Sequence, residues 1–213
     1  MTLKDGTRVS LNTGTRLLVR YDDKVRGVQL ESGEALFDVA QNAAMPFIVT
    51  AGERSIEALG TSFVVRRDER QLAVTLIEGK VSVSTPAARA SGGRDSPDTG
   101  TVISLTPGER VTFPVSASAA RHDRPELEKL TAWQRGLVAL DYTPLADAAK
   151  EMNRYSDIEV VIDNSEAAAA RISGVFRAGE SLSFAQAIAK TYRLDIAEQS
   201  NRIVISGTPQ QAQ

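Results

Sequence analysis

Polar and apolar residues alternate along most of the chain between Thr7 and Pro114. Residues 7–11 read Thr-Arg-Val-Ser-Leu, which has the period of two that a half-buried β-strand requires. Similar runs follow at residues 17–21, 25–30, 35–39, 47–50, 55–59, 62–66, 72–77, 80–84, 101–105 and 110–113. Dipeptides typical of turns separate them, among them Ser32-Gly33 and Pro107-Gly108. The pattern predicts an all-β domain over residues 3–114, and it leaves open whether the strands form a sandwich or a solenoid-like stack.

Two stretches interrupt or end this pattern. Residues 87–100 are rich in Ala, Ser, Gly, Arg and Asp, and we expect a hairpin loop there. Residues 115–132 are expected to form a linker and a connecting helix. The small polar residues 116–123 supply the linker, and residues 125–135 have the apolar spacing of a helix.

The period changes near Leu137. Residues 137–140 predict a strand, Thr143 an N-cap and Pro144 the first residue of a helix that continues to about Met152. Residues 158–162 and 172–176 predict strands, and Ser183 with Gln186 forms a capping box for a second helix. Strands at residues 194–197 and 203–205 complete the pattern. Residues 133–207 therefore predict a small two-layer α+β module with a βαβ repeat, which makes the chain mainly β plus α+β.

Composition excludes several classes of chemistry. The chain has 213 residues, a net charge of −2 and no cysteine, so thiolate catalysis and cysteine-ligated metals are excluded, and nothing indicates a nucleic-acid surface. The one histidine, His122, is expected to be a solvated linker residue. Glu31 with Glu34, and Asp22 with Asp23, are the close carboxylate pairs, and we interpret them as turn residues rather than a glycosidase pair. We expect no catalytic residues, no cofactor and no metal.

Gly33, Gly60 and Gly79 lie at the ends of strand-like runs, and we interpret them as turn residues that supply positive φ or a close backbone approach. No stretch approaches the ~20 apolar residues of a transmembrane helix, and no signal-peptide pattern opens the chain. We interpret Met1 as a start within a longer protein, so an upstream segment is expected.

Three features suggest contact surfaces. Residues Ile172, Ser173, Gly174, Val175 and Phe176 form either a core strand of the module or an edge that pairs with a partner strand. Ile203, Val204 and Ile205 are a second candidate edge, because they are apolar and only Arg202 guards them. Trp133 is expected to pack between the two domains or into the small module rather than to anchor an interface.

Several strings, in order, resemble the FecR family of single-pass sigma-factor regulators. They are residues 3–12 (LKDGTRVSLN), 33–40 (GEALFDVA), 46–49 (PFIV), 59–65 (LGTSFVV), 78–83 (EGKVSV), 105–109 (LTPGE), 132–136 (AWQRG), 144–145 (PL) and 152–155 (MNRY). One departure is Met45, where the family usually carries Arg. The last ~75 residues also resemble the short module at the N-termini of secretins and TonB-dependent transducers.

The resemblance implies a topology and a partner. A cytoplasmic segment that binds a sigma factor and a transmembrane helix would precede Met1, and the chain would lie in the periplasm. Its partner would be the N-terminal signalling domain of a TonB-dependent outer-membrane transporter for iron-siderophore or haem uptake. The sigma factor and the membrane would be contacted only through the upstream segments.

These observations predict a signal-receiving region of an anti-sigma factor or sigma regulator that is not an enzyme. A periplasmic assembly scaffold that oligomerises through the βαβ module is the alternative. A glycan-processing enzyme that uses surface carboxylates is the third hypothesis.

Overall fold

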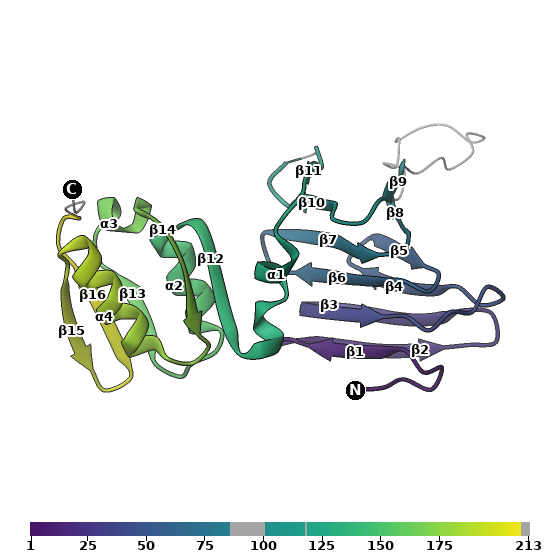
Figure 1. The fold of residues 1–213 in the computed structure, drawn as a ribbon, viewed down its shortest axis with the longest axis horizontal. Coiled ribbons are helices and arrows are strands. Elements are labelled where there is room, and N and C mark those ends of the chain that lie inside the picture. The colour runs from purple at the N-terminus through teal and green to yellow at the C-terminus, as the bar shows by residue number, and fades with distance from the viewer. Residues whose placement is uncertain (86–100, 118, 210–213) are drawn as a thin grey trace, which may run out of the picture. The chain divides into compact units, whose positions relative to one another are not determined.

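The computed structural model describes residues 1–85, 101–117 and 119–209 and divides the chain into two compact units, Met1–Leu127 and Glu128–Gln213 (Figure 1). The hairpin loop expected at residues 87–100 lies outside the described residues. The prediction of a mainly β protein is confirmed. No helix in the described part of the chain is both long and apolar enough to cross a membrane.

One sheet of eleven strands forms the first unit. Its strands are β1 (Arg8–Leu11), β2 (Arg16–Tyr21), β3 (Arg26–Asp38), β4 (Phe47–Ala51), β5 (Arg54–Ala58), β6 (Ser62–Arg67), β7 (Gln71–Glu78), β8 (Val81–Thr85), β9 (Thr101–Leu105), β10 (Arg110–Pro114) and β11 (Arg121–Asp123). The order is β11-β10-β7-β6-β3-β4-β5-β8-β9, with β1 and β2 also paired to β3. Among the described strand pairs of this sheet, β3–β4 is the one parallel pair.

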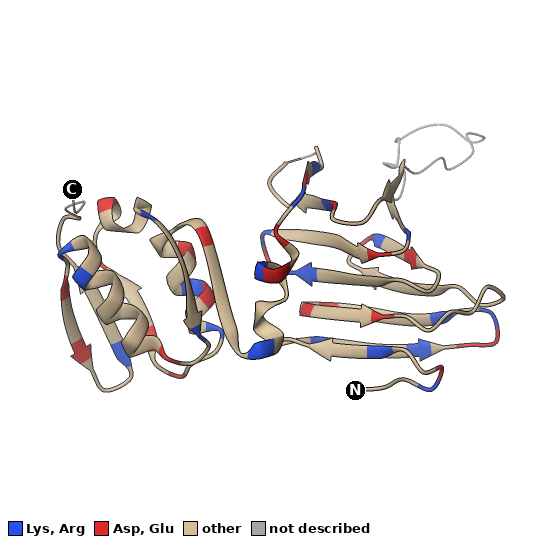
Figure 2. Cartoon of the chain, viewed as in Figure 1, with Lys and Arg blue, Asp and Glu red and all other residues tan. Residues whose placement is uncertain are grey.

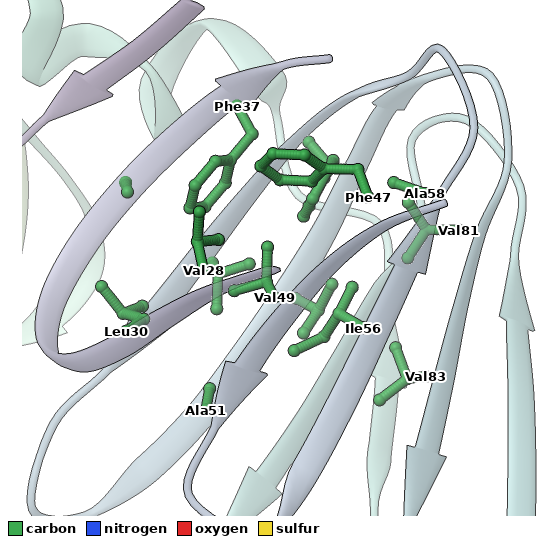
Figure 3. Close-up of a cluster of buried hydrophobic side chains, with 14 of the residues drawn as sticks. Val28, Leu30, Phe37, Phe47, Val49, Ala51, Ile56, Ala58, Val81 and Val83 are labelled. Carbon is green, nitrogen blue, oxygen red and sulfur yellow. The ribbon is translucent and has the colours of Figure 1, made fainter. Parts of the chain in front are cut away.

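β3 joins the two halves of this sheet. Its first half pairs with β2 and β4, and its second half pairs with β1 and β6. The inward-facing residues of both halves form one core (Figure 3) that includes Phe37, Phe47, Val49, Ile56, Phe63 and Val83. The rings of Phe37 and Phe63 stack with centroids 5.2 Å apart. The arrangement is one curled sheet that encloses a single core.

The prediction of a turn at Ser32-Gly33 is wrong, because β3 runs through it. Gly33 has the positive φ that we expected, 94°, but it lies inside the strand beside a register shift in the β2–β3 pairing. A Cβ atom at this position would lie 2.5 Å from the Cα atom of Thr15, so only glycine fits. Gly60 and Gly79 also have positive φ, 64° and 89°, and both lie between strands as expected.

The segment between the expected domains differs from the prediction. Arg121–Asp123, expected as linker, forms β11, in which His122 pairs with Val111 and is exposed. The connecting helix is two short pieces, α1 (Leu127–Leu130) and the 3₁₀ helix η1 (Ala132–Arg135), because Thr131 adopts φ −98° and ψ 6° between them. Gly136, at φ 69°, ends η1.

The second unit contains two sheets rather than the single sheet that a two-layer module requires. Its elements are β12 (Leu137–Pro144), α2 (Leu145–Asn153), β13 (Glu159–Ile162), α3 (Ser165–Ala169), β14 (Arg171–Arg177), α4 (Ser181–Tyr192), β15 (Asp195–Gln199) and β16 (Arg202–Ser206). β12 pairs only with β14, and the other sheet has the order β13-β16-β15. α2 contacts strands of both sheets. One apolar core, which includes Leu145, Met152, Phe184 and Ile205, serves both.

Both predicted helix starts are displaced. Thr143 is not an N-cap, because β12 continues to Pro144 and the Thr143 hydroxyl bonds to the backbone of Asp141. The capping box is also wrong, because α4 begins at Ser181 and Ser183 therefore lies within its first turn. The unexpected helix α3 does have a side-chain cap, since Asn164 Oδ1 accepts from two of its N–H groups.

Candidate protein-interaction site

Strand β14 has one paired edge and one open edge. It pairs with β12 alone, and no other described strand pairs with it. The segment Ile172–Phe176 lies within this strand. Ile172 is buried and Phe176 half-buried, whereas Ser173 is exposed and Val175 is 60% exposed. The strand therefore contributes one face to the core and presents the other to solvent.

The open edge carries backbone groups that point away from β12. In an antiparallel pair, every second residue directs its N–H and C=O groups outwards. The Ala178 N–H donates to the Gly136 carbonyl at 2.9 Å, and this sets the phase so that odd-numbered residues of β14 point outwards. The carbonyl of Arg171 already accepts from the Tyr192 hydroxyl at 2.6 Å. Ser173 and Val175 are the central residues of this edge and are free to pair with a further strand.

A bulge in β12 lies opposite this edge. Leu140 pairs with Gly174 and Thr143 with Ile172, so Asp141 and Tyr142 together oppose the single residue Ser173. Tyr142 has φ 47°, in the left-handed region that non-glycine residues rarely adopt. Such a conformation costs about 1 kcal/mol or more and persists only where its surroundings enforce it.

Two residues of β14 hold the bulge. The Ser173 hydroxyl accepts the N–H of Tyr142 at 2.8 Å, and Arg171 Nη1 donates to the Tyr142 carbonyl at 3.3 Å. The guanidinium carbon of Arg171 lies 5.5 Å from the centre of the Tyr142 ring. The ring itself remains outside, with Tyr142 72% exposed. The bulge thus directs a tyrosine to solvent beside an arginine, and both residue types are enriched at binding hot spots.

The inner face of β14, opposite its solvent-exposed face, is closely packed. The rings of Phe176 and Phe184 meet edge to face, with centroids 4.9 Å apart. Gly174 makes room for that contact, since a Cβ atom there would lie 3.1 Å from Cε2 of Phe176. The open edge therefore sits on a rigid support, which lowers the entropy lost on binding.

Charges of both signs surround the site (Figure 2). Arg177 lies 3.7 Å from Glu180, and Asp141 lies 3.2 Å from Lys129. All four side chains are at least 37% exposed, so these ion pairs contribute little stability. They remain available to a partner that offers complementary charges.

The second predicted edge is not an edge. Ile203, Val204 and Ile205 lie in β16, which pairs with β13 on one side and β15 on the other. The segment lacks charged residues because it is a buried central strand, in which Ile203 and Ile205 are 3% and 0% exposed. This segment has no free backbone groups with which a partner strand could pair.

Trp133 lies in η1, within the second unit, and is half-buried. Its indole Nε1 is buried without an acceptor among the described residues. Its role at the domain junction stays a prediction.

The carboxylates that we weighed as a catalytic pair have structural contacts. Glu31 pairs with Arg16 at 3.8 Å, and buried Glu34 accepts from the Asn12 amide at 2.7 Å. Asp22 caps a turn by accepting from the N–H groups of Lys24 and Val25, which lowers the pKa of its carboxyl. Within the described residues, no group of three or more His, Asp and Glu side chains could hold a metal ion.

Tyr142 was missed by sequence reasoning. The expected helix start at Thr143 placed this residue in a connecting loop, and a bulge depends on cross-strand register that one strand does not reveal. The available signal was an aromatic residue just before Thr-Pro, at the end of a strand-like run.

Comparison with known proteins gives a family match and a fold match. Residues 1–82 match the family model described as FecR protein. Two crystal structures of a "putative anti-sigma factor" from Parabacteroides distasonis ATCC 8503 are similar to this chain, each at 27% identity and a TM-score of 0.78. Each alignment covers 98% of this chain and 93% of the other. No curated protein matches the chain.

Proposed function

We propose, from the match of residues 1–82 to the FecR family model, that this chain is the signal-receiving region of a sigma-factor regulator. The observation that carries the proposal is similarity over nearly the full length, 98% of the chain, to the crystal structure described as a "putative anti-sigma factor". That similarity includes the second unit, which the family match does not reach. The alternation of short strands and the absence of a catalytic motif fit a binding role.

The proposed location is the periplasm, on the soluble side of a single-pass inner-membrane protein. The support is resemblance: FecR-family regulators contact the sigma factor through a cytoplasmic segment and cross the membrane once. Both described units would then lie in the periplasm, and the sigma factor would be reached only through the cytoplasmic segment that the resemblance implies.

The proposed partner is the N-terminal signalling domain of a TonB-dependent outer-membrane transporter, in iron-siderophore or haem uptake. We place its docking site on β14. An extended segment of the partner would pair with the outward N–H and C=O groups of Ser173 and Val175. Tyr142 and Arg171 would contact its side chains, since aromatic and arginine residues dominate the energy of most interfaces.

Docking transmits a signal only if the partner binds two states of the regulator with different affinity. The bulge at Tyr142 is the proposed two-state element, because its strained φ of 47° is held by contacts from Ser173 and Arg171 of β14. A strand added to β14 would stabilise the strained form.

The test is hydrogen exchange of the full chain with and without the signalling domain of a transporter encoded beside it. We expect the amides of Ser173 and Val175, which point outwards, to become protected in the complex. Protection confined to the first unit would place the docking site there instead. No protection anywhere, with both proteins at tens of micromolar, would overturn the proposal.

A scaffold role rests on the same open edge, because a second copy of β14 could pair with it. Sedimentation velocity of the chain alone distinguishes the two functions. A regulator that waits for a partner is expected to be monomeric, whereas a scaffold is expected to self-associate with a concentration-dependent sedimentation coefficient.

A further inference from the structure

Two arginines occupy inward-facing positions at one end of the core of the first unit. Arg54 begins β5 and shares its face with the buried residues Ile56 and Ala58. Arg67 ends β6, in phase with the buried residues Phe63 and Val65. Inward-facing strand positions in a core are ordinarily apolar, so a pair of cations there requires an explanation.

The fold brings both side chains to the same end of this core. The β4–β5 turn follows Ala51, which pairs with Arg54, and a Cβ atom at Gly52 in that turn would lie 3.6 Å from Nη2 of Arg67. On the opposite side, the guanidinium carbon of Arg54 lies 4.0 Å from the centre of the Phe113 ring. Phe113 pairs with Leu72, which in turn pairs with Arg67. These contacts and pairings place both side chains at the same end of the core.

Neither cation forms a salt bridge with another residue that the structure describes. Among the residues that the structure describes, no carboxylate oxygen lies within 4.0 Å of the side chain of Arg54 or Arg67. Arg67 donates Nη1 to the carbonyl of Leu30 at 3.1 Å, and the buried Nε of Arg54 has no acceptor in the described chain. Burial lowers the pKa of Arg54, and only the neighbouring Glu53 opposes that effect.

An unpaired cation next to apolar residues carries a desolvation cost that an anion would relieve. The contact with the Phe113 ring restricts the Arg54 guanidinium, which lowers the entropy that it would lose on binding an anion. Two guanidinium groups supply two positive charges and several N–H donors, which match the charge and oxygen count of a phosphate group.

We propose that Arg54 and Arg67 form a binding site for a phosphate-type oxyanion. The phosphate is either free or part of a larger molecule such as a phospholipid headgroup. This site lies in the first unit and is independent of the docking strand β14 and of its partner.

The test is an NMR titration of the full chain with inorganic phosphate at constant ionic strength, with chloride as the reference anion. The Nε–H signals of Arg54 and Arg67 and the amide of Gly52 are expected to shift and saturate at millimolar phosphate. Arg54→Gln and Arg67→Gln are each expected to weaken the interaction about tenfold or more. The control Arg20→Gln, an exposed arginine of β2, should leave it unchanged.

Two further arms complete the experiment. Arg67→Lys keeps the positive charge but loses the planar arrangement of N–H donors, so intermediate affinity for phosphate is expected. This variant also serves as the test if a glutamine variant does not fold. Binding to phosphatidylglycerol vesicles but not phosphatidylcholine vesicles would identify a lipid headgroup as the source. Shifts that fail to saturate, or that chloride reproduces, would overturn the proposal.

Discussion

The Asp5 carboxylate lies 2.6 Å from the guanidinium of Arg26, whose side chain is only 2% exposed. Arg26 also donates to the carbonyls of Ala40 and Met45, each at 2.9 Å. Asp5 is the only carboxylate paired with Arg26 in the described residues, and Tyr21 donates to it at 2.9 Å. The segment before β1 thus neutralises a buried charge at the start of β3. Met45 contributes its backbone carbonyl to the contact with Arg26. The contact therefore does not depend on the side chain at this position, where the FecR family usually carries Arg.

Asp5→Ala is expected to lower the free energy of unfolding of the first unit by about 3–5 kcal/mol, because it leaves Arg26 buried without a counter-charge. Hydrogen exchange of β1 to β4 amides measures this. The control Glu31→Ala removes an exposed partner of Arg16 and should cost less than about 1 kcal/mol. Equal effects of the two variants would contradict the role assigned to Asp5.

The same contact predicts a dependence of stability on pH. Burial raises the pKa of the Asp5 carboxyl, but hydrogen bonds from Thr7, Arg26 and Tyr21 outweigh it and lower the pKa from 3.8 to about 2. The lowered pKa stabilises the fold above about pH 4, and this contribution is lost as the pH falls towards about 2. The difference in stability between wild type and Asp5→Ala should therefore narrow by about 1 to 2 kcal/mol across that window, measured by urea unfolding. A constant difference would contradict the assignment.

Features of the fold that depend on neighbouring residues were predictable from the sequence, whereas features that depend on distant segments were not. Alternation predicted strands at residues 35–39 and 62–66, which overlap β3 and β6, because a strand's period is local. The continuity of β3 through Gly33 was not predictable, since a glycine with positive φ serves a turn and a bulged strand equally well.

The candidate site divides in the same way. The Ile172–Phe176 strand was predictable from its own residues. Those residues left open whether the strand lies at an edge or in the core. Its open edge, and the central place of Ile203–Ile205, depend on which strands pair across the unit. A short apolar run reads alike in both positions, so sequence alone could not separate them.

Gly174 is expected to be required for the packing beneath β14. In Gly174→Ala, the new Cβ atom would lie 3.1 Å from the Phe176 ring, which must move away from Phe184. A loss of about 1–3 kcal/mol in the unfolding free energy of the second unit should follow. Fluorescence of Trp133, the only tryptophan and a residue of that unit, measures it during urea unfolding. The neighbouring control Val175→Ala, at an exposed position, should stay within about 0.5 kcal/mol.

Tyr142→Gly separates stability from binding. Glycine adopts a φ of 47° without strain, so the unfolding free energy should stay unchanged or rise by up to about 1 kcal/mol, although the contact with Arg171 is lost. Affinity for the signalling domain should fall about tenfold or more, because the aromatic side chain is absent. Urea unfolding and calorimetry measure the two quantities. A variant that binds as tightly as wild type would remove Tyr142 from the docking site.

Calorimetric titration of Val175→Pro with the signalling domain tests the central claim most directly. Proline removes the outward N–H of residue 175, which would donate to a carbonyl of the partner strand. The pairing of β14 with β12 does not use this N–H. The matched control is Glu198→Pro, an exposed position on β15 at the edge of the other sheet. The account predicts that Val175→Pro weakens binding about tenfold or more and that Glu198→Pro binds like wild type. Equal affinity of Val175→Pro and wild type would contradict docking at β14.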